Sequence, residues 1–127
     1  MATKVLIIDD SAVIGMALTM RLKSAGYEAA AVRSGTAGIQ EALQNRPDVV
    51  VMDVNMPNMD GFEVHRQMQA SPELRNVPVI FLTGDHLEDV MLRAKAAGVK
   101  EVLPKLNAPG ALAKAIDAAV GATPRES

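Results

Sequence analysis

Apolar residues form five short runs along the chain, and a segment with helical spacing follows each run. The runs cover residues 4–8, 27–32, 48–52, 77–82 and 99–103. Most of them are apolar at successive positions and rich in β-branched residues, which is typical of strands that a parallel sheet buries on both faces. The pattern therefore predicts five β-strands.

The segment after the first run shows how the helices are predicted. Ser11 is a good N-cap, because its hydroxyl can accept a hydrogen bond from a free backbone N–H of the first turn. Gly26 can end the helix, because glycine adopts the left-handed backbone conformation without strain. The predicted inner face consists of Ile14, Ala17, Leu18, Leu22 and Ala25.

Four further helices follow from the same spacing. One covers residues 36–44, one begins at Phe62 and ends near Ser71, one ends at Gly98, and the last reaches Gly121. Their predicted inward-facing residues are Ile39, Ala42 and Leu43; Phe62, Val64 and Met68; Leu87, Val90, Met91 and Ala94; and Leu112, Ala115, Ile116 and Ala119.

Regular alternation of strands and helices predicts an α/β fold with right-handed crossovers and helices on both faces of the sheet. We expect a flavodoxin-like, doubly wound, five-stranded parallel sheet with the strand order 2-1-3-4-5 and five helices. The 127 residues suit one domain. We place that domain at residues 1–121 and a flexible tail at residues 122–127.

Composition excludes several function classes. Charged residues make up 22% of the chain and the net charge is −2, which argues against broad binding to nucleic acid or to an anionic membrane. Three aromatic residues and no tryptophan give no stacking platform for single strands. The absence of cysteine removes disulfides and thiolate metal sites and suits a reducing compartment. No segment reads as a signal peptide or a membrane span, so we expect a cytoplasmic protein.

Polar residues follow the predicted strands at the ends where ligands bind in open α/β sheets. Asp9 and Asp10 follow the first strand, Asp53 the third, Thr83 the fourth and Lys105 the fifth. In the predicted strand order, the first and third strands are neighbours. We therefore expect all these side chains to meet at one edge of the sheet.

Three neighbouring carboxylates repel one another, and a divalent cation relieves this repulsion. Oxygen ligands favour Mg²⁺, which usually binds one or two carboxylates together with a phosphoryl oxygen. Lys105 can pair with Asp53 or with a phosphoryl oxygen, and the Thr83 hydroxyl can donate to another. These residue types suit phosphoryl transfer, with Asp53 as the nucleophile that forms an acyl phosphate.

Taken together, these residues resemble the receiver domain of two-component response regulators, in particular single-domain, chemotaxis-regulator-like receivers. The resemblance includes the turn from Met56 to Gly61 after Asp53 and the Pro104–Lys105 pair, and it extends from Lys4 to about Val120. It implies a signalling module rather than an enzyme, apart from catalysis of its own phosphorylation and dephosphorylation.

The resemblance implies a role for each site residue. Asp53 would accept a phosphoryl group from a phosphohistidine on a sensor histidine kinase or a histidine phosphotransfer protein. Asp10, Asp53 and the backbone carbonyl of Asn55 would bind Mg²⁺, with Asp9 acting through a metal-bound water. Thr83 and Lys105 would contact the phosphoryl oxygens. Output would then go to a downstream protein or onward by phosphotransfer, unless the chain is part of a longer protein.

The sequence departs from the family pattern at three positions. Val102 stands where the family often has a tyrosine or phenylalanine that turns inward, so an aromatic switch cannot operate in its usual form. Leu106 replaces a proline with a cis peptide bond, so the bond before it is either trans or strained. Gly84 replaces a small alanine and adds backbone freedom.

Two other functions are possible for an aspartate nucleophile on this type of fold. A haloacid-dehalogenase-type phosphatase also uses aspartate, Mg²⁺, threonine and lysine, but it needs an acid two residues after the nucleophile, where this chain has Asn55. A flavodoxin-like cofactor carrier would need a phosphate-binding loop after the first strand, where Asp9 and Asp10 would repel the phosphate.

The sequence also predicts the position or role of several other residues. Val13, Met16 and Met20 form a second apolar stripe on the first helix, which either docks a phosphodonor or packs within the domain. His65 and His86 are expected at the surface. Asn55 and Asp85 flank the acceptor, and their polarity suggests a fairly short-lived phosphoryl group.

Overall fold

The five predicted strands form one parallel sheet in the computed structural model, which describes residues 2–84, 86–107 and 110–122. The strand order is β2-β1-β3-β4-β5, as predicted, and every neighbouring pair is parallel. The strands are β1 (Lys4–Ile8), β2 (Glu28–Val32), β3 (Val49–Asp53), β4 (Val79–Thr83) and β5 (Glu101–Pro104).

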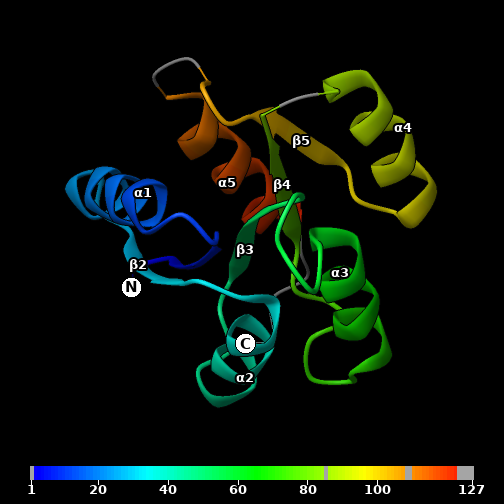
Figure 1. Cartoon of the computed structure of the whole chain (residues 1–127). Coiled ribbons are helices and arrows are strands. Elements are labelled where there is room, and N and C mark those ends of the chain that lie inside the picture. Colours follow the sequence, from blue (N-terminus) through cyan, green and yellow to red (C-terminus); the bar gives the residue numbers. More distant parts are fainter. Residues whose placement is uncertain (1, 85, 108–109, 123–127) are drawn as a thin grey trace.

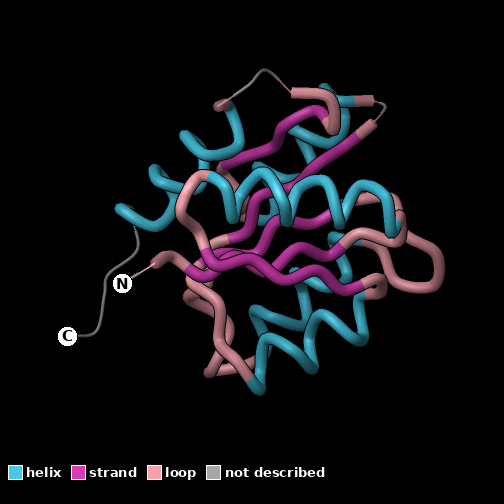
Figure 2. The backbone as a smooth tube through the Cα atoms, turned by 90° about the vertical axis from the view of Figure 1, so that its left-hand side faces the viewer, coloured by secondary structure: helices cyan, strands magenta, loops and turns pink. Residues whose placement is uncertain are grey.

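Helices cover both faces of the sheet, so the molecule has three layers (Figures 1 and 2). The helices are α1 (Ala12–Ser24), α2 (Gly35–Gln44), α3 (Gly61–Ala70), α4 (Leu87–Ala97) and α5 (Ala111–Ala122). Helices α1 and α5 lie over one face, whereas α2, α3 and α4 lie over the other (Figure 1). This arrangement is the doubly wound fold that the sequence predicts.

A hydrophobic core lies on each face of the sheet, and strand β3 contributes to both. Val49 and Val51 pack with residues of α1 and α5, whereas Val50 and Met52 pack with residues of α2, α3 and α4. Each of these four side chains is fully buried. Because both faces are covered, the strand has no polar–apolar alternation, and the acid at its end is carried into the interior.

Caps fix where the helices begin and end. The Ser11 hydroxyl accepts a hydrogen bond from the Ile14 backbone N–H at 3.3 Å, as predicted. Gly26 and Gly98 both adopt left-handed backbone conformations at the ends of α1 and α4, with φ of 97° and 88°. The first and fourth helices therefore end where the sequence predicts.

Some predicted inner faces are wrong in detail. Leu43 is half exposed, because α2 turns Gly35, Gly38 and Ala42 toward the sheet instead. On α1, Ala17 and Ala25 are exposed, and on α4 the inner residues are Val90 and Ala94 rather than Leu87 and Met91. The predicted inner face of α5 is confirmed, and Val120 adds to it.

The C-terminal boundary differs slightly from the prediction. Helix α5 continues through Ala122, one residue into the predicted tail. Residues 123–127 lie outside the described residues, so the flexible tail stays a prediction. In the described part of the chain, no helix has the length and apolar character needed to span a membrane.

Tyr27 connects the start of β2 to α5, and it provides a test of this packing. Its hydroxyl donates a hydrogen bond to Asp117 Oδ1 at 2.6 Å. This bond favours the protonated phenol and, with burial and the charge of Asp117, raises the pKa of Tyr27 to about 12.

We expect the phenol absorbance of the native protein to titrate near pH 12 and to return toward the ordinary value in Asp117→Asn. The signal is clean because the chain has one tyrosine and no tryptophan. Because the folded-state pKa lies above the unfolded one, this contribution to stability is present below the unfolded pKa and is lost as pH rises toward 12. Identical titrations in the two proteins would contradict the assignment.

Candidate acidic site at the carboxyl ends of the strands

The polar residues at the strand ends meet as predicted, because the register of the sheet brings them level. Asp53 is the last residue of β3 and Thr83 the last of β4, while Asp9 follows β1 and Lys105 follows β5. Thr83 is paired with Pro104, and the Lys105 backbone N–H donates to the Thr83 carbonyl at 2.9 Å. The Lys105 side chain therefore begins beside Thr83.

An ion pair lies at the centre of the site. Lys105 Nζ is 2.8 Å from Asp53 Oδ2 and 3.7 Å from Asp9 Oδ2. Both carboxylates are almost fully buried, whereas the Lys105 side chain remains partly open to solvent. The ammonium therefore reaches in from the rim of the site and contacts two buried acids at once.

Backbone N–H groups hold the second oxygen of each of these carboxylates. Asp9 Oδ1 accepts a hydrogen bond from Ser11 N at 2.9 Å, and Asp53 Oδ1 accepts one from Asn55 N at 3.0 Å. Each acid thus closes a short turn with the residue two positions on. The turns fix both side chains, so the oxygens that face Lys105 are held in position.

The charges of the site shift two pKa values. Burial raises the pKa of Asp9, and the Asp53 and Asp10 charges add to that, while the bond from Ser11 and the Lys105 charge oppose it. Burial by itself lowers the pKa of Lys105, but the hydrogen bond that the ammonium donates to Asp53 and the charges of the three acids outweigh burial and raise it. Lys105 is therefore a firmly protonated cation.

The donor set fits a hard divalent cation. Oxygens of Asp9, Asp10 and Asp53 lie within 4.8 Å of one another. Asp9 Oδ2 and Asp53 Oδ2 are buried, and within the described residues the Lys105 ammonium is the cation that both face. Carboxylate oxygens at this spacing match the ligands that Mg²⁺ prefers. The side chain of Asn55 is exposed, so the predicted metal contact of this residue concerns only its backbone carbonyl.

The structure shows the local geometry at two positions that depart from the family pattern, Leu106 and Gly84. The Lys105–Leu106 peptide bond is trans, and the Leu106 side chain is 96% exposed. A methyl group at Gly84 would approach only Lys105 Cδ, at 3.9 Å, so alanine would fit there. Asp85, which the sequence analysis places beside the acceptor, lies outside the described residues.

One histidine contradicts the sequence prediction. His65 is only 7% exposed, because α3 turns Gly61, Val64, His65 and Met68 toward the core. Their spacing of three, four and seven residues is the signal that could have identified it. His86 is exposed as predicted and precedes α4 in a left-handed conformation, with φ of 55°.

A sheet of this order with an acid cluster and a lysine at its carboxyl end defines the class of protein. The family model of the response regulator receiver domain matches residues 5–117. The chain therefore belongs to the response regulator receiver domain family.

Individual relatives agree with this assignment. The chain is 34% identical to protein PilH of Pseudomonas aeruginosa over 91% of its own length and 95% of that protein. Other matching response regulators are longer, and the chain spans 45% of one and 23% of another.

Among solved structures, the chain is similar to chemotaxis protein CheY4 of Vibrio cholerae. The TM-score is 0.87 at 31% identity, covering 94% of this chain and 99% of that one. It is also similar to the receiver domain of sensor histidine kinase PA1611 from P. aeruginosa, described with a magnesium ion coordinated in its active site cleft. That match has a TM-score of 0.86 at 26% identity and covers 96% and 100% of the two chains. The haloacid-dehalogenase alternative is not supported by these comparisons.

Gly61 makes the closest approach to the backbone of the site. A Cβ atom there would lie 2.9 Å from the Asp53 carbonyl oxygen and 3.1 Å from Val54 Cα. Both neighbours are backbone atoms that cannot rotate away. The Gly61 backbone N–H also donates to the Val54 carbonyl at 3.0 Å, which ties the start of α3 to the end of β3.

We therefore expect Gly61→Ala to lower the free energy of unfolding by about 1–3 kcal/mol, the usual range for overpacking. Gly121→Ala is the matched control, because nothing lies within 4 Å of a Cβ at that position. It should be neutral or stabilising, since alanine favours helix over glycine by up to about 1 kcal/mol. Urea denaturation measures both variants, and equal stability would show that the close approach at Gly61 is not constraining.

Proposed function

We propose that this receiver domain, at residues 1–121, carries a signal as an aspartyl phosphate on Asp53. The observation that carries the proposal is the geometry of Asp53. It is a buried carboxylate at the end of the central strand, 2.8 Å from a lysine ammonium and within 4.8 Å of two more acids.

The proposed metal ligands are the carboxylates of Asp10 and Asp53 and the backbone carbonyl of Asn55, with Asp9 acting through a metal-bound water. The proposed ion is Mg²⁺, which suits these oxygen donors and is described in the PA1611 receiver. When bound, Mg²⁺ would neutralise negative charge on the phosphoryl oxygens. Side chains of the protein carry out the other steps of the proposed reaction.

Asp53 acts as the nucleophile in the proposed reaction. One of its oxygens forms a bond to phosphorus while the bond between phosphorus and the donor imidazole nitrogen breaks, and the electron pair of that bond stays on the imidazole. Lys105 then pairs with a phosphoryl oxygen, and the Thr83 hydroxyl donates to another. Thr83 ends β4, the neighbour of β3, and Lys105 follows β5 but already reaches Asp53, so both can act without rearrangement of the sheet.

The proposed donor is a sensor histidine kinase or a histidine phosphotransfer protein, and the proposed receiver of the signal is a further protein. Apart from its own phosphorylation and dephosphorylation, the domain catalyses no reaction in this proposal. The proposal includes a cytoplasmic location, which agrees with the absence of cysteine from the chain. The effect of Asn55 and Asp85 on phosphoryl lifetime also stays a prediction.

The test of the acceptor is phosphorylation by a small molecule. With Mg²⁺ and acetyl phosphate or phosphoramidate, we expect the intact mass to increase by one phosphoryl group, and chelation of Mg²⁺ should prevent the increase. Asp53→Asn should abolish the adduct. Asp48→Asn is the matched control, because Asp48 is an exposed acid at the opposite end of β3 that accepts a bond from Lys4 N at 2.8 Å.

An adduct that survives in Asp53→Asn would show that another residue accepts the phosphoryl group. Steady turnover of phosphate esters by the native protein would instead indicate a phosphatase. Loss of the adduct in both variants would indicate general damage to the fold.

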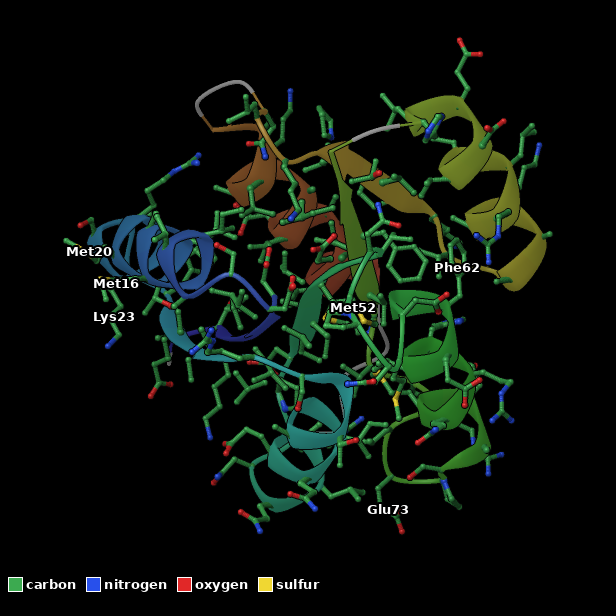
Figure 3. All side chains as sticks on the ribbon, viewed as in Figure 1. Met16, Met20, Lys23, Met52, Phe62 and Glu73 are labelled. Atoms are coloured by element: carbon green, nitrogen blue, oxygen red, sulfur yellow. The ribbon has the colours of Figure 1, made fainter. Side chains whose placement is uncertain are left out.

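The apolar stripe on α1 is proposed as part of the phosphodonor surface. Val13 is 78% exposed and Met16 and Met20 are each 64% exposed, so this stripe does not pack within the described domain. The two methionines lie on the outer side of the helix, directed away from the sheet (Figure 3). Methionine adapts to varied partner surfaces.

Replacing Met16 and Met20 by lysine should slow phosphoryl transfer from the cognate protein donor by at least about tenfold, as expected when interface residues worth more than 1 kcal/mol are lost. Phosphorylation by acetyl phosphate should be unchanged. Met91→Lys, at a half-exposed methionine on α4, is the control. Rates reduced equally with both donors would contradict the proposed surface.

A further inference from the structure

His65 is a buried polar residue that the acceptor site does not use. Its ring packs edge-on against Phe81, with the centroids 6.2 Å apart and an interplanar angle of 77°. In the described part of the chain, the imidazole has no hydrogen-bond partner, and burial alone accounts for its lowered pKa. Its ring nitrogens are not among the fully enclosed atoms that lack a partner, so they remain accessible to a ligand at the edge of the ring.

The imidazole borders a groove of about 500 Å³, which is within the range of small-molecule sites. The groove is lined from the end of α3, the start of β4, the end of α4, the start of β5 and the C-terminal part of α5. It is at the opposite end of β4 from Thr83, about 13 Å away at the usual rise per residue of a strand. It is therefore separate from the acid cluster.

The charges around the groove favour an anion. Arg75 and Lys100 both line it, and neither has an ion-pair partner within residues 2–84, 86–107 and 110–122. Glu73, two residues before Arg75, accepts a hydrogen bond from the Ser71 hydroxyl at 2.7 Å instead. Glu101 is the one acid that lines the groove, so two cations face a single carboxylate.

The remaining walls of the groove are largely apolar. Pro78 and Val79 contribute from the start of β4, and Val99 contributes from the segment before β5. A ligand that fits would therefore combine an acidic group, for the cations, with an apolar body, for this wall.

We propose that this groove binds a small organic anion, whose carboxylate or phosphate group pairs with Arg75 and Lys100 and accepts a hydrogen bond from His65. The apolar body of the ligand lies on Val79 and Val99. This site is independent of Asp53, so it can exist whether or not Asp53 accepts a phosphoryl group.

Binding should change the titration of His65 in a defined direction. Burial lowers the pKa of His65, so the free protein holds a neutral imidazole near neutral pH. A bound anion favours the imidazolium and raises that pKa. The charged groups around the groove are Arg75 after α3, Lys100 after α4 and Glu101 on β5, with Glu73 near Arg75. In the free protein, burial is the cause of the lowered pKa, and the bound anion adds a negative charge that opposes it.

The experiment follows the ring signals of the two histidines by NMR during pH titration, with benzoate and phenyl phosphate as probes in buffer without Mg²⁺ or chelator. We expect at least one probe to raise the pKa of His65 by about 1 unit, as opposite charges at short range do. His86 is an exposed internal control and should respond only to ionic strength. A response to one probe alone distinguishes a carboxylate site from a phosphate site.

Two variants complete the test. Arg75→Gln combined with Lys100→Gln should abolish the response of His65, whereas Lys23→Gln combined with Arg46→Gln should retain it, because these residues lie elsewhere on the surface. His65→Leu should reduce any rise of the unfolding midpoint that the probe causes in the native protein. An unmoved His65 signal, a shift shared with His86, or a response that survives in Arg75→Gln/Lys100→Gln would each overturn the proposal.

Discussion

The contact between Lys105 and the two buried acids offsets part of the negative charge of the acidic site. Parallel strands bring their carboxyl ends to one edge, and in this chain that edge carries Asp9, Asp10 and Asp53 within 4.8 Å of one another. Without a cation, such a cluster would take up protons or separate. Lys105 provides the positive charge, and its position depends on the backbone bond from Lys105 N to the Thr83 carbonyl. The register between β4 and β5 therefore sets the electrostatics of residues on β1 and β3.

Topology explains why so much of the site could be predicted from the sequence. A residue at the carboxyl end of a parallel strand has its position fixed once the strand order is known. The alternation of strands and helices predicts a parallel sheet, and the order 2-1-3-4-5 is that of the flavodoxin-like fold. Asp53 illustrates this point, because four buried residues before it leave the carboxylate at the end of the central strand. The sequence could not reveal the pairing in detail, such as Lys105 contacting Asp9 as well as Asp53, because side-chain distances depend on packing.

The wrong predictions of which helix residues face inward have a common physical origin. Helical spacing identifies an apolar face, but it does not determine how closely the helix approaches the sheet. Helix α2 packs with Gly38 against Ile8, where any Cβ would overlap with the isoleucine side chain. This close packing turns the small residues inward and leaves Leu43 outside. On α3 the buried face includes His65, which was assigned to the surface because of its polarity rather than its position in the helix.

Val102 changes how the site is connected to the rest of the molecule. It lies opposite Phe81 in the sheet and has no ring that could rotate. The aromatic contacts instead involve Phe62 at the start of α3 (Figure 3). Its ring centroid lies 4.8 Å from that of Phe81 on β4, and the Arg93 guanidinium of α4 lies 4.0 Å from the Phe62 centroid. Phe62 follows Gly61, whose backbone N–H is bound to the residue after Asp53. The turn beyond the acceptor is therefore joined to α4 through Phe62 and Arg93, by contacts that do not involve position 102.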